Sequence, residues 1–266
     1  MGNYLTRFLY TIPLYRFVLY CLIVLAGITL AYGAAGVMNP GGSAQLLTLV
    51  MIMLVSIIVN ALWAHVLNIK NDWESTSITA LILFFIFTPP VNTLEKISLI
   101  IASALAVSSK YLFTVKKRHL FNPVAVAAVL GGLVGIQNFG WWVGNSAMVI
   151  PMAIIGALIV LRMRRVVMVV WFMVVAFLTI LVTTGMPLSH IFTSWPLLFF
   201  GAVMFTEPLT SPTMPGAQLI YAVLVGVLFG YKFQLGPLHS TPELALVVGN
   251  IYTFAARHKW GIGKVR

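Results

Sequence analysis

Two acidic residues stand where proline interrupts apolar stretches of the chain. Glu207 precedes Pro208, and Glu243 follows Pro242. A carboxylate in or near the hydrocarbon of a membrane is costly, so it is retained mainly where it handles a proton or cation, or bonds to a cofactor. The plainer alternative is that each carboxylate only caps the backbone amides of a helix.

The other three of the five acidic residues are expected in ordinary roles. Asp72 and Glu74 lie in a polar segment between two apolar stretches, where we expect them to be solvated or to cap the next helix. Glu95 is directly followed by Lys96, and we expect an ion pair at the membrane interface. The two proline-flanked glutamates therefore remain the acidic candidates for function.

Two proline motifs recur along the chain at a matched spacing. The segments 87–90 (Phe-Thr-Pro-Pro) and 205–208 (Phe-Thr-Glu-Pro) each end an apolar stretch, 118 residues apart. Each is followed by a motif with proline at a helix start, Asn122-Pro123 and Thr241-Pro242, 119 residues apart. Proline breaks a helix, and membranes tolerate such breaks only inside protein or beside a polar cavity. We expect the two breaks to line one central polar site.

A basic cluster comes directly before the first of these helix starts. It consists of Lys116, Lys117, Arg118 and His119. Asn122 is typical of a helix N-cap, and the helix N-terminus behind it carries partial positive charge. The cluster has the chemistry to bind phosphate or an acidic partner. The alternative is that it only sets the orientation of the chain in the membrane.

Composition identifies the protein class that must position these residues. Apolar residues make up 61% of the 266 residues and charged residues 8%, against about 25% in soluble proteins. A single-core soluble enzyme is excluded, and an all-α integral membrane protein is predicted. The net charge of +11 does not indicate nucleic-acid binding, because no basic run is interleaved with aromatic residues. No phosphate-binding loop, hydrolase pattern or metal-ligand spacing occurs.

The hydropathy pattern predicts ten transmembrane spans. They are expected at about 16–38, 45–66, 76–89, 94–114, 121–138, 146–161, 166–185, 191–206, 216–233 and 241–256. The third and eighth spans are short and end at the proline motifs. With both chain ends in the cytoplasm, 14 of the 16 Lys and Arg residues lie on the cytoplasmic side, and only Lys96 and Lys232 lie opposite. This asymmetry predicts cytoplasmic termini.

The matched motifs also predict an internal duplication. We expect one membrane domain over residues 1–266, made of repeats over about 1–140 and 141–266. Because five spans per repeat is an odd number, the second repeat would be inserted upside down. Such inverted-topology repeats place their site near the bilayer midplane, at discontinuous helices.

These motifs together resemble a known family. The resemblance is carried by the segments 72–80 (DWESTSITA), 88–90 (TPP), 110–111 (KY), 121–123 (FNP), 141–144 (WWVG), 206–213 (TEPLTSPT), 241–243 (TPE) and 249–250 (GN). Their order and spacing resemble the NqrB/RnfD family, whose members are membrane components of the sodium-translocating NADH:quinone reductase (NqrB) and of the Rnf electron transport complex (RnfD). The closest resemblance is to relatives that accompany a ferredoxin–NADP-reductase-like flavin domain.

The resemblance implies a flavin-dependent electron-transfer subunit of a bacterial inner membrane. It would accept electrons from a cytoplasmic NAD(P)H- or ferredoxin-linked reductase module and pass them to quinone or another membrane acceptor, in some relatives with cation transport. The flavin (FMN, riboflavin or FAD) is expected to be non-covalent, because no Ser/Thr-Gly-Ala-Thr attachment motif occurs. Expected cofactor-binding residues are Thr88, Pro89, Asn122, Pro123, Thr206, Glu207, Pro208, Thr210, Thr241 and Glu243.

A transporter or channel remains the alternative. Inverted repeats with broken helices are a transporter architecture, so the physical pattern alone favours a pathway for a small polar solute. In either case Glu207 and Glu243 are the residues expected to handle a proton or ion.

Overall fold

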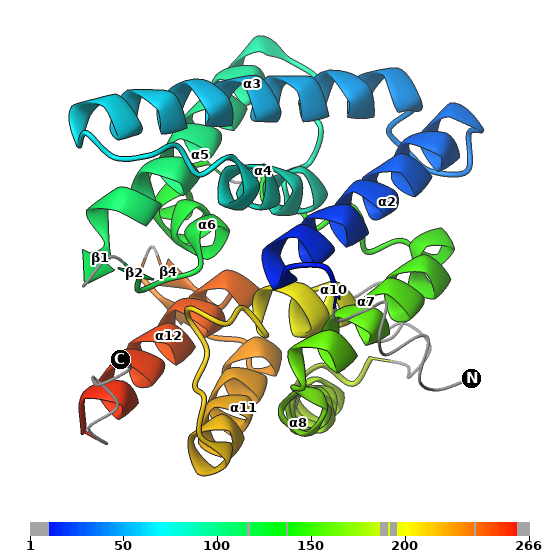
Figure 1. Cartoon of the computed structure of the whole chain (residues 1–266). Coiled ribbons are helices and arrows are strands. Elements are labelled where there is room, and N and C mark those ends of the chain that lie inside the picture. The colour runs from blue at the N-terminus through cyan, green and yellow to red at the C-terminus, as the bar shows by residue number, and fades with distance from the viewer. Residues whose placement is uncertain are drawn as a thin grey trace.

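The computed structural model describes residues 11–115, 118–136, 138–186, 191, 196–236 and 238–259. The described chain is mostly helical, with two short β-hairpins (Figure 1). Lys116 and Lys117 of the basic cluster, and part of the predicted span 191–206, lie outside the described residues.

The described part of the first half contains five helices and one hairpin. The helices are α2 (Leu14–Ala34), α3 (Gly42–Val66), α4 (Trp73–Ile86), α5 (Thr93–Leu112) and α6 (Pro123–Leu133). Between α5 and α6, strands β1 (Thr114–Val115) and β2 (Arg118–His119) pair antiparallel, with Thr114 opposite His119. The sequence pattern did not predict this hairpin.

The described part of the second half, like the first, consists of helices followed by a hairpin and a last helix. They are η1 (Ser146–Met148), α7 (Val149–Met163), α8 (Val166–Thr184), α10 (Leu197–Phe199), the π-helix η2 (Phe200–Met204), α11 (Pro215–Gly230), β3 (Gln234–Leu235), β4 (Leu238–His239) and α12 (Pro242–Lys259). Strands β3 and β4 again form an antiparallel hairpin between the last two helices.

Among the described residues, four stretches of helix are long and apolar enough to cross a membrane, which is consistent with an all-α membrane protein. They are Leu14–Ala34, Gly42–Val66, Ser146–Met163 and Val166–Thr184. The helices begin and end within a few residues of most predicted spans. The clearest exception is the span predicted at 121–138, because α6 ends at Leu133.

Local sequence explains where the helices begin. Asp72 caps α4 by accepting from the Ser75 amide at 3.1 Å, as expected for an acidic residue before a helix. Asn122 caps α6 by accepting from the amides of Val124 and Ala125, both at 3.1 Å, and Pro123 occupies the first turn. The two prolines and caps predicted from the sequence therefore do start α6 and α12.

The prediction of an ion pair between Glu95 and Lys96 at the start of α5 is wrong. The Glu95 carboxylate accepts from the Val91 amide and the Asn92 side chain, both at 2.8 Å, while Asn92 accepts from the Glu95 amide. This reciprocal cap provides hydrogen bonds for backbone amides at the start of the helix. If the Glu95 carboxylate bonded to Lys96 instead, the Val91 amide would lose its acceptor. Glu74 instead pairs with Arg16 at 2.6 Å.

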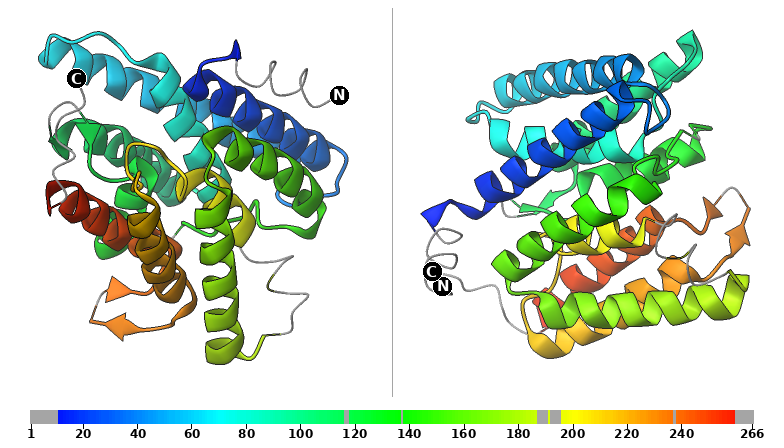
Figure 2. Two further views of the ribbon diagram at one scale, coloured as in Figure 1. Left: turned by 60° about the horizontal axis from the view of Figure 1, so that its bottom comes forward. Right: turned by 90° about the vertical axis from the view of Figure 1, so that its right-hand side faces the viewer.

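Helices from the two halves enclose a core built around α4 and the short helices α10 and η2 (Figures 1 and 2). Helix α4 is buried from Thr79 to its end, although it has only 14 residues. Helices α8 and α11 pack closely, because Gly226 and Gly230 of α11 leave no side chain between the two backbones. The short discontinuous helices are thus interior elements.

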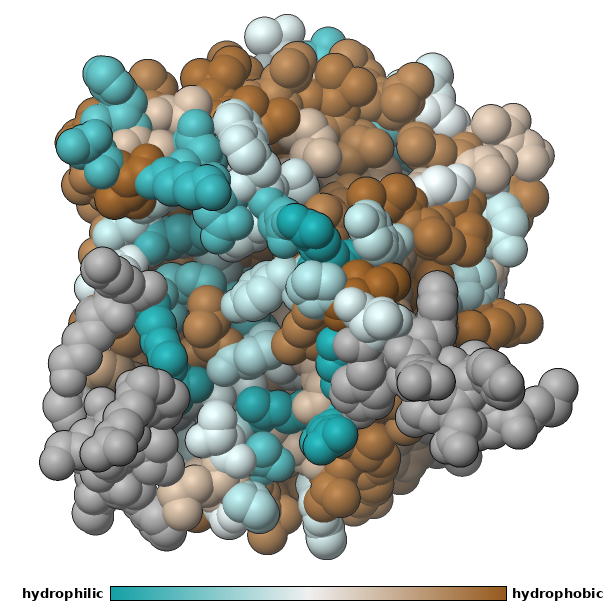
Figure 3. Space-filling model, in the orientation of Figure 1, coloured by the Kyte–Doolittle hydropathy of each residue, from teal (hydrophilic) through white to brown (hydrophobic). Residues whose placement is uncertain are grey.

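Figure 3 shows hydrophilic side chains gathered over the middle of one face, with hydrophobic side chains around its rim. Many large apolar residues on the long helices are exposed, including Val66, Ile150 and Val182. In a soluble protein such a surface would drive aggregation, whereas lipid covers it in a membrane. The exposed surface therefore agrees with a membrane-embedded protein.

Candidate functional site

Glu207 is the centre of a polar cluster at the break after η2. Its carboxylate lies 2.8 Å from Nε2 of His119 and accepts from Nδ2 of Asn122 at 2.9 Å and from the Thr210 hydroxyl at 3.1 Å. The side chains of His119 and Glu207 are 9% and 17% exposed. All three partners can donate, so the site suits a negatively charged carboxylate.

Asn250 of α12 also belongs to this cluster. Its Oδ1 accepts from the Asn122 amide at 2.9 Å, and its Nδ2 donates to the Thr210 carbonyl at 3.2 Å. Asn250 is fully buried, so both ends of its amide are used where unpaired groups would be costly. We define the Glu207 cluster as His119, Asn122, Glu207, Thr210 and Asn250.

Two arginines fix the loop that carries Glu207. Arg257 of α12 donates to the carbonyls of Leu209 at 2.8 Å, Ser211 at 2.8 Å and Pro208 at 3.3 Å. Arg165, at the start of α8, donates to the carbonyl of Pro212. Since proline and the helix break leave carbonyls without intrahelical donors, the guanidinium groups supply them.

Glu243 belongs to a second cluster, at the break after α4. Its Oε1 accepts from Nε1 of Trp141 at 2.6 Å, and Glu243 is 2% exposed. The Trp141 backbone amide donates to the Ile86 carbonyl at 3.0 Å, at the end of α4. Trp141 has a φ of 49°, which is uncommon for a large side chain and is retained here with the indole aimed at the carboxylate.

The predicted residues thus fall into two groups rather than one. Asn122, Pro123, Thr206, Glu207, Pro208 and Thr210 lie around the Glu207 cluster, whereas Thr88, Pro89, Thr241 and Glu243 lie around the end of α4 and the start of α12. We define the Glu243 cluster as Thr88, Trp141, Thr241 and Glu243. The two clusters lie near opposite ends of α4. Ser75 lies beside Glu207 and Ile86 lies beside Trp141, and α4 rises about 16 Å between these two positions.

Each cluster combines the two halves of the chain. In the Glu207 cluster, the break after η2 meets the start of α6, and in the Glu243 cluster the break after α4 meets the start of α12. Thr241 caps α12 by accepting from the Leu244 amide at 3.1 Å. Both clusters therefore place the N-terminus of a proline-started helix against a discontinuous helix of the other half.

Aromatic side chains fill the space between the clusters. Trp141 lies 6.1 Å from Phe200, Phe200 lies 5.3 Å from Phe172, and Phe172 lies 4.5 Å from Phe205, measured between ring centroids. Phe205 then stacks on Tyr221 at 4.7 Å. We call these five residues the aromatic column. It starts at the residue that binds Glu243 and reaches Phe205, two positions before Glu207.

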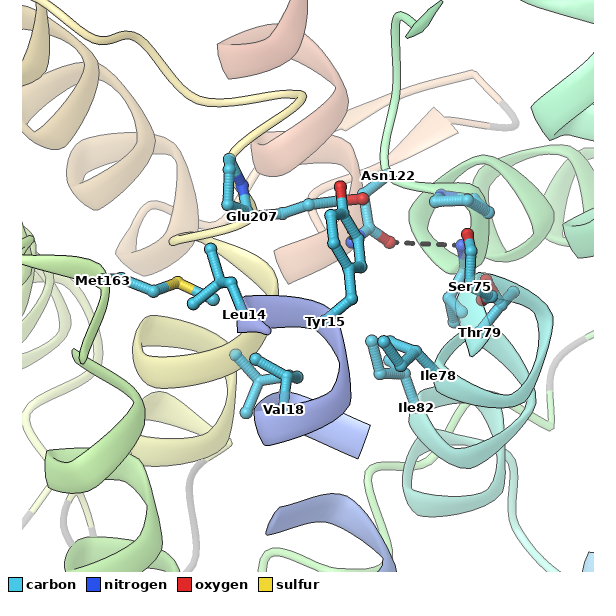
Figure 4. Close-up of a pocket in the computed structure, with 14 residues that line it drawn as sticks. Leu14, Tyr15, Val18, Ser75, Ile78, Thr79, Ile82, Asn122, Met163 and Glu207 are labelled. Atoms are coloured by element: carbon cyan, nitrogen blue, oxygen red, sulfur yellow. Dashed lines mark hydrogen bonds between the residues drawn. The ribbon is translucent and has the colours of Figure 1, made fainter. Parts of the chain in front are cut away.

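The central pocket beside Glu207 is narrow (Figure 4). Glu207, Asn122 and the Tyr15 hydroxyl lie toward one end, and apolar side chains such as Val18 and Ile82 line the other. Its free volume of about 40 Å³ holds a few water molecules. A tricyclic ring does not fit there, so the residues around Glu207 hold a proton or a small ion better than a large cofactor.

A larger cavity lies beside Glu243. Its volume is about 400 Å³, which is in the range of small-molecule sites. Apolar residues of α6 and Phe139 form most of the lining, and His239, Thr241 and Glu243 supply the polar groups. An aromatic ring system with a few donors and acceptors suits this lining.

Some residues of the two clusters are not indicated as site residues by the sequence. Asn250 and Trp141 occur in the segments that carry the family resemblance, but nothing in the sequence indicates their bonds to Asn122 and Glu243. In the sequence, Arg257 indicates only the orientation of the chain in the membrane. Pairings over more than 100 residues, such as Trp141 with Glu243, need the fold.

No family model matches the chain, and no curated protein matches it significantly.

Proposed function

We propose that the chain is a membrane subunit for flavin-dependent electron transfer, built from two inverted repeats. Its ten spans would run through a bacterial inner membrane with both termini in the cytoplasm. The observation that carries the proposal is the aromatic column, a packed path from the Glu243 cluster toward the Glu207 cluster.

The repeated order of elements supports the inverted repeat. Helices α2, α3, α4, α5 and α6 would correspond in order to α7, α8, the α10–η2 pair, α11 and α12, and a hairpin precedes the last helix in each half. The two hairpins lie 120 residues apart, with His119 of β2 matching His239 of β4. The exchanged contacts, in which each broken helix meets the last helix of the other half, are those that a two-fold axis in the membrane plane would generate.

Contacts between distant loops support the orientation. Arg16 pairs with Glu74, and Arg165 donates to the Pro212 carbonyl. All four residues have cytoplasmic positions in the predicted topology. Segments assigned to the far side also meet, since Thr88 bonds to Asn138 through its backbone at 2.8 Å. Basic residues on one side of the membrane are the usual cytoplasmic signature.

The aromatic column favours electrons over solutes. Its four Phe and Tyr rings are fully buried and are stacked or tilted against one another, so the column itself has no water-filled space. A polar solute needs a hydrated route, whereas an electron can cross packed protein. The charged clusters at either end would hold the protons or cations that balance transferred charge.

The cavity beside Glu243 fits the flavin better than the Glu207 cluster does, because only the former has the volume for a ring system. Thr241 and Glu243 would bond to the ring edge, and Phe139 would pack against its face. The chemistry that a bound flavin supplies is the acceptance of two electrons together and their release one at a time. Trp141 orients the Glu243 carboxylate, and the aromatic column excludes water behind it.

The remaining partners follow from the same orientation. A reductase module for NAD(P)H or ferredoxin would dock on the cytoplasmic face, near hairpin β1–β2 and the end of α12. Positive charge for this docking would come from the basic cluster of Lys116, Lys117, Arg118 and His119. Within this cluster, His119 also bonds to Glu207. The electron acceptor would be quinone or another membrane carrier, and membrane lipid would cover the apolar rim.

An absorption spectrum of the detergent-purified chain tests the proposal. We expect flavin bands near roughly 370 and 450 nm, released into the supernatant on denaturation, with or without prior incubation with FMN or riboflavin. Glu243→Gln should shift or weaken these bands, whereas the matched variant Glu95→Gln, at an exposed helix start, should not. A colourless protein that binds neither flavin would overturn the cofactor assignment, and a band near roughly 410 to 430 nm would indicate haem.

A transporter for a small polar solute is the second candidate, and the paired broken helices favour it. Flux measurements in proteoliposomes separate the two. Solute uptake by colourless protein would support the transporter, whereas reduction of ferricyanide trapped inside vesicles, by an external reductant, would support electron transfer. Phe172→Ala should slow only the latter while flavin stays bound.

A further inference from the structure

A third, polar cavity lies beside the Glu207 cluster, between the start of α4, the end of α5 and hairpin β1–β2. It has a volume of about 730 Å³ and is lined by residues that include Tyr15, Asp72, Lys110 and His119. We call it the Lys110 cavity. Its volume is in the range of small-molecule sites, and more polar and charged residues line it than line the cavity beside Glu243.

Two buried donors in this cavity have no acceptor. Nζ of Lys110 and the hydroxyl of Tyr15 are inaccessible to solvent and make no hydrogen bond within the part of the chain that the structure describes. Both residues line the Lys110 cavity. An unpaired buried ammonium group is costly, so this arrangement points to an acceptor that the chain itself does not supply.

Neighbouring charged groups already have partners of their own. The Asp72 carboxylate accepts from the Ser75 amide at 3.1 Å, and Glu74 pairs with Arg16 at 2.6 Å. His119 lies 2.8 Å from Glu207. Among the lining residues, the buried side-chain atoms that make no hydrogen bond within the described residues are Nζ of Lys110 and the Tyr15 hydroxyl, and both are donors.

We propose that the Lys110 cavity binds the phosphate group of a small phosphomonoester. Lys110 would donate from its ammonium group and Tyr15 from its hydroxyl, and a phosphate offers several acceptor oxygens to both. Inorganic phosphate fills only a small part of 730 Å³, so room remains for the organic part of the ligand. The phosphate could come from a soluble metabolite or from a lipid headgroup, since both present the same oxygens.

This site goes beyond the proposed function. Neither Lys110 nor Tyr15 belongs to the aromatic column or to the cavity beside Glu243. Phosphate binding and flavin binding can therefore succeed or fail separately, and phosphate binding is measurable on colourless protein.

Titration calorimetry on the full chain in phosphate-free detergent buffer tests the site, with inorganic phosphate, ribose 5-phosphate and ribose as probes. We expect ribose 5-phosphate to bind more tightly than phosphate, and ribose not to bind. For the lipid source, the unfolding temperature is compared in nanodiscs of phosphatidylcholine with and without phosphatidic acid. An increase with phosphatidic acid alone would identify a lipid headgroup as the ligand.

Two variants and one control separate the site from general electrostatics. Lys110→Met should raise the Kd of the bound probe about tenfold or more, and Tyr15→Phe about threefold, because a charge-assisted bond is stronger than a neutral one. If the lipid is the ligand, both variants should remove the increase in unfolding temperature. Lys96→Met is the control, because Lys96 lies at the opposite end of the same helix. The proposal is overturned if no phosphate probe binds, or if Lys110→Met behaves like Lys96→Met.

Discussion

At the scale of single residues, Glu207 differs from the other acids because three side chains depend on it. His119, Asn122 and Thr210 all direct a polar atom at its carboxylate, and they come from three different segments. The carboxylate thus joins hairpin β1–β2, the start of α6 and the loop after η2. The residue that we propose to handle a proton or ion is therefore also a structural one.

Removing this carboxylate should therefore destabilise the protein. Glu207→Ala leaves Asn122 and Thr210 with buried donors unpaired, and we expect a loss of about 2 to 4 kcal/mol in the free energy of unfolding. Glu207→Gln keeps two acceptor positions on one oxygen and should cost less. Thermal unfolding in detergent gives both values. As a control, Glu95→Ala removes an exposed helix cap and should cost about 1 kcal/mol. Equal effects of the two alanine variants would refute the central role of Glu207.

The sequence predicted single residues well where the reason was local. Proline, asparagine and aspartate placed the starts of α4, α6 and α12, because caps depend on a few neighbouring residues. The expected single site was not seen, since the ten residues form two clusters at opposite ends of buried α4. Which break faces which helix start depends on the packing of the halves, and no local pattern encodes it. The burial of Lys110 was missed for the same reason.

At the scale of elements, the short discontinuous helices depend on close packing of the long ones around them. A methyl group on Gly230 would lie 2.7 Å from Cβ of Thr179 and 2.9 Å from the Ile180 amide nitrogen, so α11 and α8 would have to separate. Gly27 of α2, by contrast, has nothing within 4 Å of the same position. The two glycines form a matched pair for testing helix contact.

Gly230→Ala should lower the free energy of unfolding by about 1 to 3 kcal/mol, as overpacking of a close interface does. Gly27→Ala should be neutral or slightly stabilising, because alanine favours a helix over glycine. Unfolding of both variants in the same detergent measures the difference. A neutral Gly230→Ala would mean that α8 and α11 do not touch through this surface.

At the scale of the whole molecule, the inverted repeat requires an odd number of membrane crossings between corresponding elements of the two halves. Between the exposed residues Arg118 of β2 and Lys232, next to β3, the chain passes through α6, α7, α8, the α10–η2 pair and α11. If all five cross the membrane, the two hairpins lie on opposite sides of it. If the short, interrupted α10–η2 pair did not cross, four crossings would put both hairpins on one side.

Cysteine labelling decides between these parities. The only cysteine, Cys21, is buried, so the unmodified chain should give little background with a membrane-impermeant maleimide. In intact cells we expect Lys232→Cys to be labelled and Arg118→Cys to be protected until the membrane is permeabilised, because the positive-inside rule places Arg118 in the cytoplasm. Labelling of both in intact cells would remove the inverted repeat together with the ten-span topology, since an even number of crossings cannot invert the second half. Labelling of Arg118→Cys alone would keep the repeat but reverse the orientation, and the reductase module would then need to dock near Lys232.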